Sequence, residues 1–172
     1  MMEFSENRDG YLEKLIFKMM ELYSGDLSQI QHFLKVHAFA RLIGLSEVLD
    51  DHSQHVLETA AVVHDVGIKA AMAKYGSAGG RYQELEGPPV AEKMLDELNC
   101  QRDIIERVCY LVAHHHTYTN IDGLDYQILV EADFLVNLAE NGIGAETIRS
   151  TRDKIFRTKT GLRCCQALFN IK

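Results

Sequence analysis

The chain has 172 residues, of which 47% are hydrophobic and 25% are charged. This composition is typical of one soluble globular domain and excludes a disordered or low-complexity protein. The formal net charge of −7 argues against duplex nucleic acid or an anionic membrane as partner, because binding to either depends on Lys and Arg neutralising phosphates. No apolar run could span a bilayer and the N-terminus does not read as a secretory signal, so we expect a cytoplasmic protein.

The first part of the chain has apolar residues at helical spacing. This spacing predicts a helix over about residues 9–23. Asp26 can cap a second helix, since its carboxylate can accept from the first free backbone amides, and Gly44 is expected to end that helix. A third helix is predicted over about residues 52–66. It is apolar on most sides and should therefore be central in the fold.

The segment from Lys69 to Gly87 breaks the helical pattern. Residues 76–80 are rich in glycine and serine, which predicts a flexible loop that is long for a small domain. Long loops of this kind often cover functional sites. The consecutive prolines that follow, Pro88 and Pro89, predict the start of a helix, because proline is tolerated in a first turn.

The remaining chain is again helical in pattern. Residues 104–112 predict a helix that runs into three consecutive histidines at 114–116. A further helix carries Asp133, and one or two helices are expected over about residues 144–169. No segment alternates convincingly as a strand. We therefore predict an all-α fold in which residues 1–172 form a single helical bundle of about six to eight helices.

Several polar residues lie where the pattern predicts a core. His64 and Asp65 close the apolar third helix, His32 shares a helix face with apolar residues, and so does Asp133. An unpaired polar group in a core costs roughly 1–3 kcal/mol, and a charge costs more. Each residue could be satisfied by a hydrogen bond of its own. A divalent ion would satisfy all four together, because imidazole and carboxylate are its common ligands.

The order of these residues resembles the HD-domain superfamily of metal-dependent phosphohydrolases. His32 followed four residues later by Val36 is similar to the first segment of the family, AAVVHDVG at 60–67 resembles the second, and VEADFLV at 130–136 resembles the last. The resemblance spans about residues 26–138. It implies a helical core that holds one or two divalent ions. The ligands that it implies are His32, His64, Asp65 and Asp133.

Related subgroups with two ions differ from this chain at one position. In them the aspartate that corresponds to Asp65 bridges the ions, a further histidine precedes the next helix, and a histidine pair comes later. Here Glu86 stands at the earlier position and His114-His115-His116 at the later one. Successive helical positions are about 100° apart, so at most two of three consecutive side chains can face one site. We expect those two to be His114 and His115, with His116 pointing outward.

The resemblance implies a phosphatase or phosphodiesterase that acts on a nucleotide or another small phosphoester through metal-activated water. In this mechanism Asp65 and Glu86 steer the attacking water, and His115 protonates the leaving oxygen. Three basic side chains are candidate phosphate contacts, namely Lys69, Lys74 and Arg81. The ion is Mn, Fe, Co, Ni, Zn or Mg.

Two other functions fit the same residues. The fold could bind a metal and a nucleotide without turnover, as a sensor module. A di-iron oxygenase is the less favoured alternative, since such sites are rich in imidazole and this chain has Glu86 where a histidine would stand. The sequence also allows the protein to form a homodimer.

Overall fold

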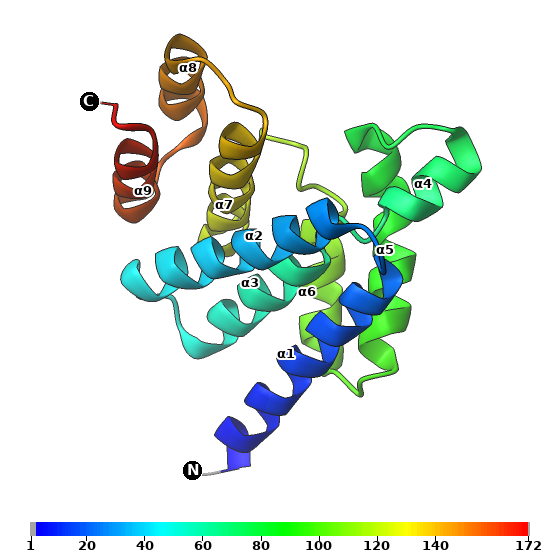
Figure 1. The fold of residues 1–172 in the computed structure, drawn as a ribbon. Coiled ribbons are helices and arrows are strands. Elements are labelled where there is room, and N and C mark those ends of the chain that lie inside the picture. Colours follow the sequence, from blue (N-terminus) through cyan, green and yellow to red (C-terminus); the bar gives the residue numbers. More distant parts are fainter. Residues whose placement is uncertain (1–2, 172) are drawn as a thin grey trace.

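A computed structural model describes residues 3–171 of the chain (Figure 1). Within that range the chain forms nine α-helices and no strand, so the prediction of an all-α single-domain fold is confirmed. The helix number exceeds the expected six to eight. No helix in this part of the chain has both the length and the apolar character needed to cross a membrane.

The helices in chain order are α1 (Glu3–Leu22), α2 (Leu27–Ser46), α3 (Asp51–Val63), α4 (Ile68–Tyr75), α5 (Gly80–Asp96), α6 (Arg102–Val112), α7 (Leu124–Glu140), α8 (Ala145–Ile155) and α9 (Lys159–Phe169). The carboxylate of Asp26 caps α2 as predicted, accepting from the backbone amide of Gln29 at 3.0 Å.

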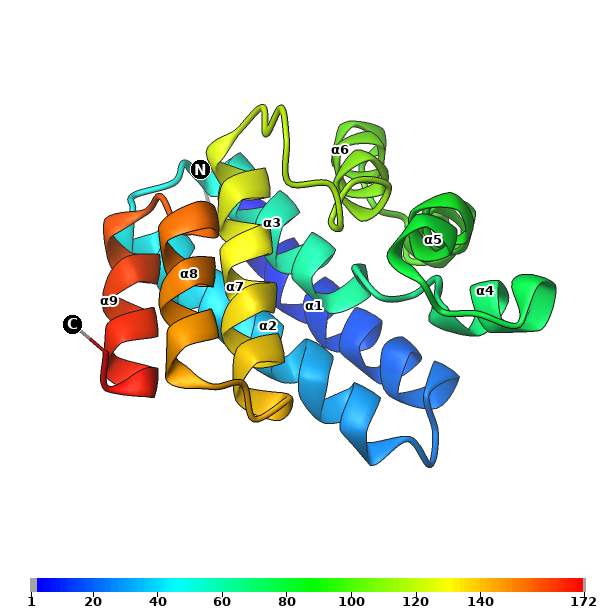
Figure 2. The ribbon, with the colours of Figure 1, turned by 90° about the horizontal axis from the view of Figure 1, so that it is seen from above.

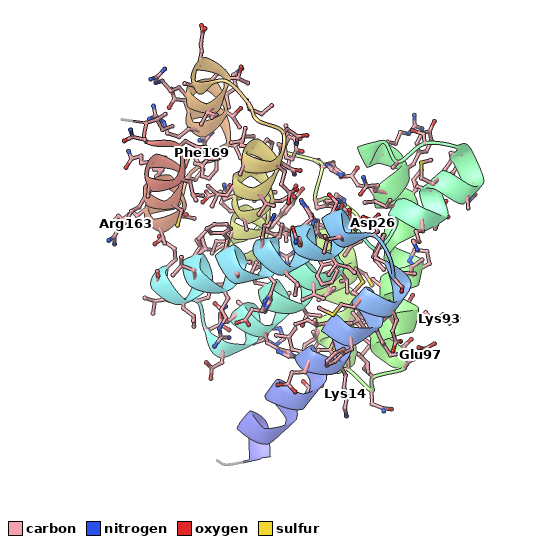
Figure 3. All side chains as sticks on the ribbon, in the orientation of Figure 1. Lys14, Asp26, Lys93, Glu97, Arg163 and Phe169 are labelled. Carbon is pink, nitrogen blue, oxygen red and sulfur yellow. The ribbon has the colours of Figure 1, made fainter. Side chains whose placement is uncertain are left out.

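The centre of the bundle is made by α2, which packs most extensively on α3 and α7. Figures 1 and 2 show these three helices between α4 and α5 at one end of the molecule and α8 and α9 at the other. In Figure 3, Arg163 and Phe169 on α9 accordingly lie far from Lys93 on α5. The fully buried apolar side chains come mainly from the three central helices, so residues on their inner faces are removed from water.

Gly44 does not end α2, which continues to Ser46. A Cβ atom at this position would lie 2.3 Å from Gln54 Oε1 and 3.0 Å from Leu57 Cδ2, both on α3. The missing side chain therefore serves close packing between α2 and α3 rather than helix termination. This close packing sets the position of one central helix against the other.

The prediction of a long loop over residues 69–87 was wrong. An alanine-rich stretch forms α4, since alanine is the best helix former, and Gly76 with φ +66° ends it. The next helix, α5, begins at Gly80, so only four residues separate the two. Pro88 and Pro89 lie inside α5 and not in its first turn as predicted.

Glycines also let α5 approach its neighbours. A Cβ atom on Gly67 would lie 2.7 Å from the backbone nitrogen of Gly87, and a Cβ atom on Gly87 would lie 2.6 Å from Val112 Cγ1. These contacts hold the turn at residues 64–67 and the last turn of α6 against the same stretch of α5. The segments that carry the predicted histidines thereby lie next to one another.

Candidate metal centre

Three central helices bring together four of the predicted ligands. His32 lies within α2, His64 is the C-cap residue of α3, Asp65 is in the following turn and Asp133 is on α7. All four are buried, with exposed fractions of 6%, 0%, 8% and 5% in that order. We call these residues the first group.

The ligand atoms of the first group lie at separations close to those expected around one ion. His32 Nε2 lies 3.2 Å from His64 Nε2, 3.1 Å from Asp133 Oδ1 and 3.5 Å from Asp65 Oδ2. His64 Nε2 lies 3.5 Å from Asp65 Oδ2 and 3.6 Å from Asp133 Oδ1. Two ligand atoms about 2.1 Å from an ion, at roughly 90–110° to each other, are roughly 3.0–3.4 Å apart.

The hydrogen bonds of the two histidines direct their lone pairs to the same point. His32 Nδ1 donates to Glu140 Oε2 at 2.9 Å, and His64 Nδ1 donates to the carbonyl oxygen of Ala61 at 2.9 Å. Carboxylate and carbonyl oxygens only accept, so the proton is on Nδ1 in both rings, and Nε2 of the neutral ring carries a lone pair. Two lone pairs and two carboxylates converging in a buried site require positive charge.

Without a metal, protons can supply that charge. Burial would lower the pKa of His64, but the neighbouring carboxylates of Asp65 and Asp133 outweigh it and raise this pKa to about 9. Burial would raise the pKa of both aspartates, but the imidazoles beside them hold each pKa well below its usual range. A divalent ion would replace the protons, because it binds neutral imidazole and ionised carboxylate. The residues therefore fit a divalent metal.

Each carboxylate of the first group also receives an amide hydrogen bond. Gln29 Nε2 donates to Asp65 Oδ2 at 2.9 Å, and Asn137 Nδ2 donates to Asp133 Oδ1 at 2.8 Å. The hydroxyl of Tyr23 donates to the backbone oxygen of Asp65 at 2.8 Å, which fixes the turn after α3. Hydrogen bonds of this kind orient ligands before a metal binds.

A second group of ligand atoms adjoins the first and shares Asp65 with it. It consists of Asp65, His115 and His116, whose ligand atoms lie within 4.8 Å of one another. His115 Nε2 is 3.5 Å from Asp65 Oδ1, while His115 Nδ1 donates to the carbonyl oxygen of Val112 at 2.8 Å. The Nε2 atoms of both histidines are buried and have no hydrogen-bond partner among the described residues. Asp65 thus offers one oxygen to each group.

The histidine run is arranged differently from the expectation. The structure brings His115 and His116 next to Asp65. In contrast, His114 Nδ1 donates to the carbonyl oxygen of Tyr110 at 2.7 Å, and the centroids of the His114 and Tyr110 rings are 4.3 Å apart. The physical reason is that α6 ends at residue 112 and residues 113–116 form a turn. The helical step of 100° per residue therefore does not apply to them.

Two of the expected phosphate contacts, Lys74 and Lys69, make hydrogen bonds to other groups, and so does Glu86. Glu86 Oε1 accepts from Lys74 Nζ at 2.7 Å and from the hydroxyl of Tyr75 at 2.8 Å, and Glu86 belongs to neither group of ligand atoms. Lys69 Nζ donates to the carbonyl oxygen of Leu22 at the end of α1. The structure thus brings neither lysine nor Glu86 to the two groups.

Arg81, the third expected phosphate contact, forms no ion pair with the described residues. It is exposed in the first turn of α5, and the described part of the chain offers its guanidinium no ion-pair partner within 4.0 Å. Its neighbour Gly80 contacts the second group, since a Cβ atom there would lie 2.7 Å from His116 Cγ. Arg81 therefore follows a residue that packs on a candidate ligand.

Three supporting residues were missed at the sequence level. Asn137 and Glu140 follow Asp133 by four and seven positions, and Gln29 precedes His32 by three. These spacings place each residue on the same helix face as a candidate ligand of its own helix. A search for polar residues at helical spacing around each candidate ligand would have found all three.

Comparisons with known proteins were made for the whole chain. No protein-family model and no curated protein matches it. A crystal structure described as a predicted HD superfamily hydrolase from an uncultured Thermotogales bacterium does match, with a TM-score of 0.67 and 22% sequence identity over 93% of this chain and 86% of that chain. The chain therefore has the same fold as that protein. The residues of the first group occur in the order expected of an HD superfamily protein, with His64-Asp65 as the central pair.

Proposed function

We propose that this protein is a metal-dependent phosphohydrolase that acts on a nucleotide or another small phosphoester. The observation that carries the proposal is the convergence of four buried ligand atoms from His32, His64, Asp65 and Asp133, separated by 3.1–3.6 Å in the five measured pairs. The HD-superfamily fold supports it. The resemblance of the sequence to phosphohydrolases of that superfamily names the reaction class.

The second group supports a centre of one or two ions. A bound divalent ion lowers the pKa of coordinated water and polarises a phosphoryl oxygen. With one ion in the first group, Asp65 Oδ1 is available to orient the attacking water and His115 Nε2 to hold the proton for the leaving oxygen, since the bond from His115 Nδ1 to Val112 leaves only Nε2 for that role. With two ions, His115 and His116 would act as ligands instead.

An aromatic surface beside the second group supports a nucleotide as substrate. The hydroxyl of Tyr118 lies 3.5 Å from His116 Nδ1, and its ring packs edge-on against Phe134 with centroids 5.0 Å apart. Phe134 directly follows Asp133, and Tyr118 is 41% exposed. An exposed aromatic ring can stack on a nucleobase. Arg81, which follows the glycine that packs on the same histidine, can contact the phosphate.

The test is phosphate release by protein stripped with a chelator and reloaded with Mn, Co, Ni, Mg, Zn or Fe(II). Nucleoside monophosphates and p-nitrophenyl phosphate serve as substrates. His64→Ala and Asp65→Ala should each lower kcat/KM by roughly a thousandfold or more, because each removes a ligand of the centre. His52→Ala, which changes a largely exposed histidine on α3, is the matched control and should keep full activity.

Unchanged activity in both variants would end the proposal. Nucleotide binding without phosphate release under every metal would favour a sensor module instead. Oxygen uptake that depends on ferrous ion would favour an oxygenase.

A further inference from the structure

The Nδ1 atom of His32 has a different kind of hydrogen-bond acceptor from the Nδ1 atoms of His64 and His115. His64 and His115 follow the ends of α3 and α6, where carbonyl groups of the last turn have no helical partner, and each donates to a carbonyl three residues before it. His32 lies within α2, where the backbone carbonyls are already used by the helix. Its Nδ1 proton instead goes to Glu140, which is 108 residues away on α7.

We propose that Glu140 is a positioning residue that fixes the orientation of His32 and strengthens it as a metal ligand. The inference rests on the proposed metal centre. Because a carboxylate only accepts, the 2.9 Å contact places the proton on Nδ1 and turns Nε2 toward His64 and Asp133. The negative charge of Glu140 also makes the imidazole a better electron donor to a metal.

The position of Glu140 has no advantage for α7 itself. It is the last residue of that helix, where the helix dipole disfavours a negative charge. The helix itself therefore does not account for a carboxylate there, and its contacts with α2 do. The side chain is only 27% exposed, and both of its oxygens are used by α2 residues, Oε2 by His32 and Oε1 by Lys35.

The contact with Lys35 defines the competing explanation. Lys35 Nζ lies 3.0 Å from Glu140 Oε1, so Glu140 could simply tie α7 to α2 through an ion pair. Lys35 is 47% exposed, and such surface pairs contribute little to stability. If tying the helices together were the whole role, removal of Lys35 and removal of Glu140 would have similar effects.

The experiment measures Co²⁺ affinity of the full chain by competition with a chromogenic chelator, together with the visible spectrum of the Co²⁺-loaded protein. Glu140→Ala should weaken binding by roughly 10–100-fold and shift the spectrum. Glu140→Gln, which keeps an acceptor and loses the charge, should fall between wild type and Glu140→Ala. Lys35→Met should change affinity by less than about fivefold, and Glu13→Ala, an exposed site on α1, should change nothing.

Thermal melts of the metal-free variants separate positioning from folding. We expect Glu140→Gln and Lys35→Met to melt alike without metal and to differ in the Tm increase that Co²⁺ produces. Wild-type affinity in Glu140→Ala, or equal losses in Glu140→Ala and Lys35→Met, would overturn the inference. Co²⁺ binding without phosphate release by the wild type would end the proposed function and leave the role of Glu140 supported. A wild-type protein that binds no Co²⁺ would overturn both.

Discussion

Single residues in this protein neutralise buried charge in two different ways. In the first group, carboxylates face imidazoles whose lone pairs converge with them, an arrangement that requires an added cation. Glu58 on α3 is different, because neighbouring side chains donate hydrogen bonds to its carboxylate and supply the positive charge. Its carboxylate accepts from Arg41 at 2.8 and 2.9 Å, from Gln54 at 2.7 Å and from His37 at 3.3 Å. Glu58 is therefore a structural carboxylate that links α2 to α3.

The pKa of Glu58 makes this link dependent on pH. Burial would raise the pKa, but the hydrogen bonds from His37, Gln54 and Arg41 lower it from 4.5 to about 2. A carboxyl with a lowered pKa stabilises the fold above its unfolded value, and this contribution is lost as pH falls from about 4.5 to about 2. The shift corresponds to about 3 kcal/mol at neutral pH.

We expect Glu58→Gln to lower the free energy of unfolding by roughly 1–3 kcal/mol at pH 7, since the neutral amide keeps part of the hydrogen bonding. Urea unfolding of wild type and variant at several pH values measures this. The difference between the two proteins should shrink toward zero near pH 2. A difference of the same size at pH 7 and pH 2 would contradict the assignment of the pKa to this link.

At the scale of elements, the ends of helices build the site. His64 follows α3, and His115 and His116 follow α6, so both segments can use free terminal carbonyls to orient their rings. The mid-helix candidate ligands, His32 and Asp133, depend on side chains of other residues for the same purpose. Helix ends and helix interiors thus contribute candidate ligands that are supported in different ways.

The same distinction explains how much the sequence could predict. The candidate ligands His32, His64 and Asp133 interrupt apolar helical stripes, and periodicity identifies such interruptions. The choice between His114 and His116 failed because it assumed a helix where the chain turns, and the point where a helix ends depends on tertiary packing. The environment of Glu86 was missed for a related reason. Its partner helix α4 was hidden by the glycines that follow it.

The start of α5 provides a test of the second group. A Cβ atom on Gly80 would meet the ring of His116 at 2.7 Å, whereas one on Gly79 would lie 3.5 Å from its closest neighbour, the Ser77 hydroxyl. Gly80→Ala should therefore displace His116 while leaving the fold intact, since alanine favours a helix. We expect kcat to fall by roughly tenfold or more, because small displacements of catalytic groups are costly.

Gly79→Ala is the matched control for this substitution and should keep activity near that of the wild type. Metal content measured on both purified variants adds a second readout. If the centre holds two ions, Gly80→Ala should lose about one of them and Gly79→Ala should lose neither. Equal activity in the two variants would show that His116 has no part in the reaction.

At the scale of the whole molecule, the first group joins segments that are far apart in the chain. His32 and Asp133 are separated by 101 positions, and the candidate ligands lie on or directly after the central helices of the bundle (Figure 2). In the unfolded chain these residues do not form a common site. An ion that binds the folded protein therefore binds the unfolded protein far less tightly, and it stabilises the fold by mass action.

At a free ion concentration 100 times Kd, the expected gain is about 2.7 kcal/mol. For a domain of this length the gain should raise Tm by about 5–10 °C. Differential scanning fluorimetry of chelator-treated protein, with and without Mn²⁺, measures the shift.

A chain with a formal net charge of −7 also binds divalent ions loosely at its surface, so the comparison between variants decides the result. His52→Ala should keep the whole shift, and His64→Ala should lose most of it because the buried imidazole at the centre of the first group is gone. An equal shift in both variants would place the stabilising ion elsewhere on the molecule.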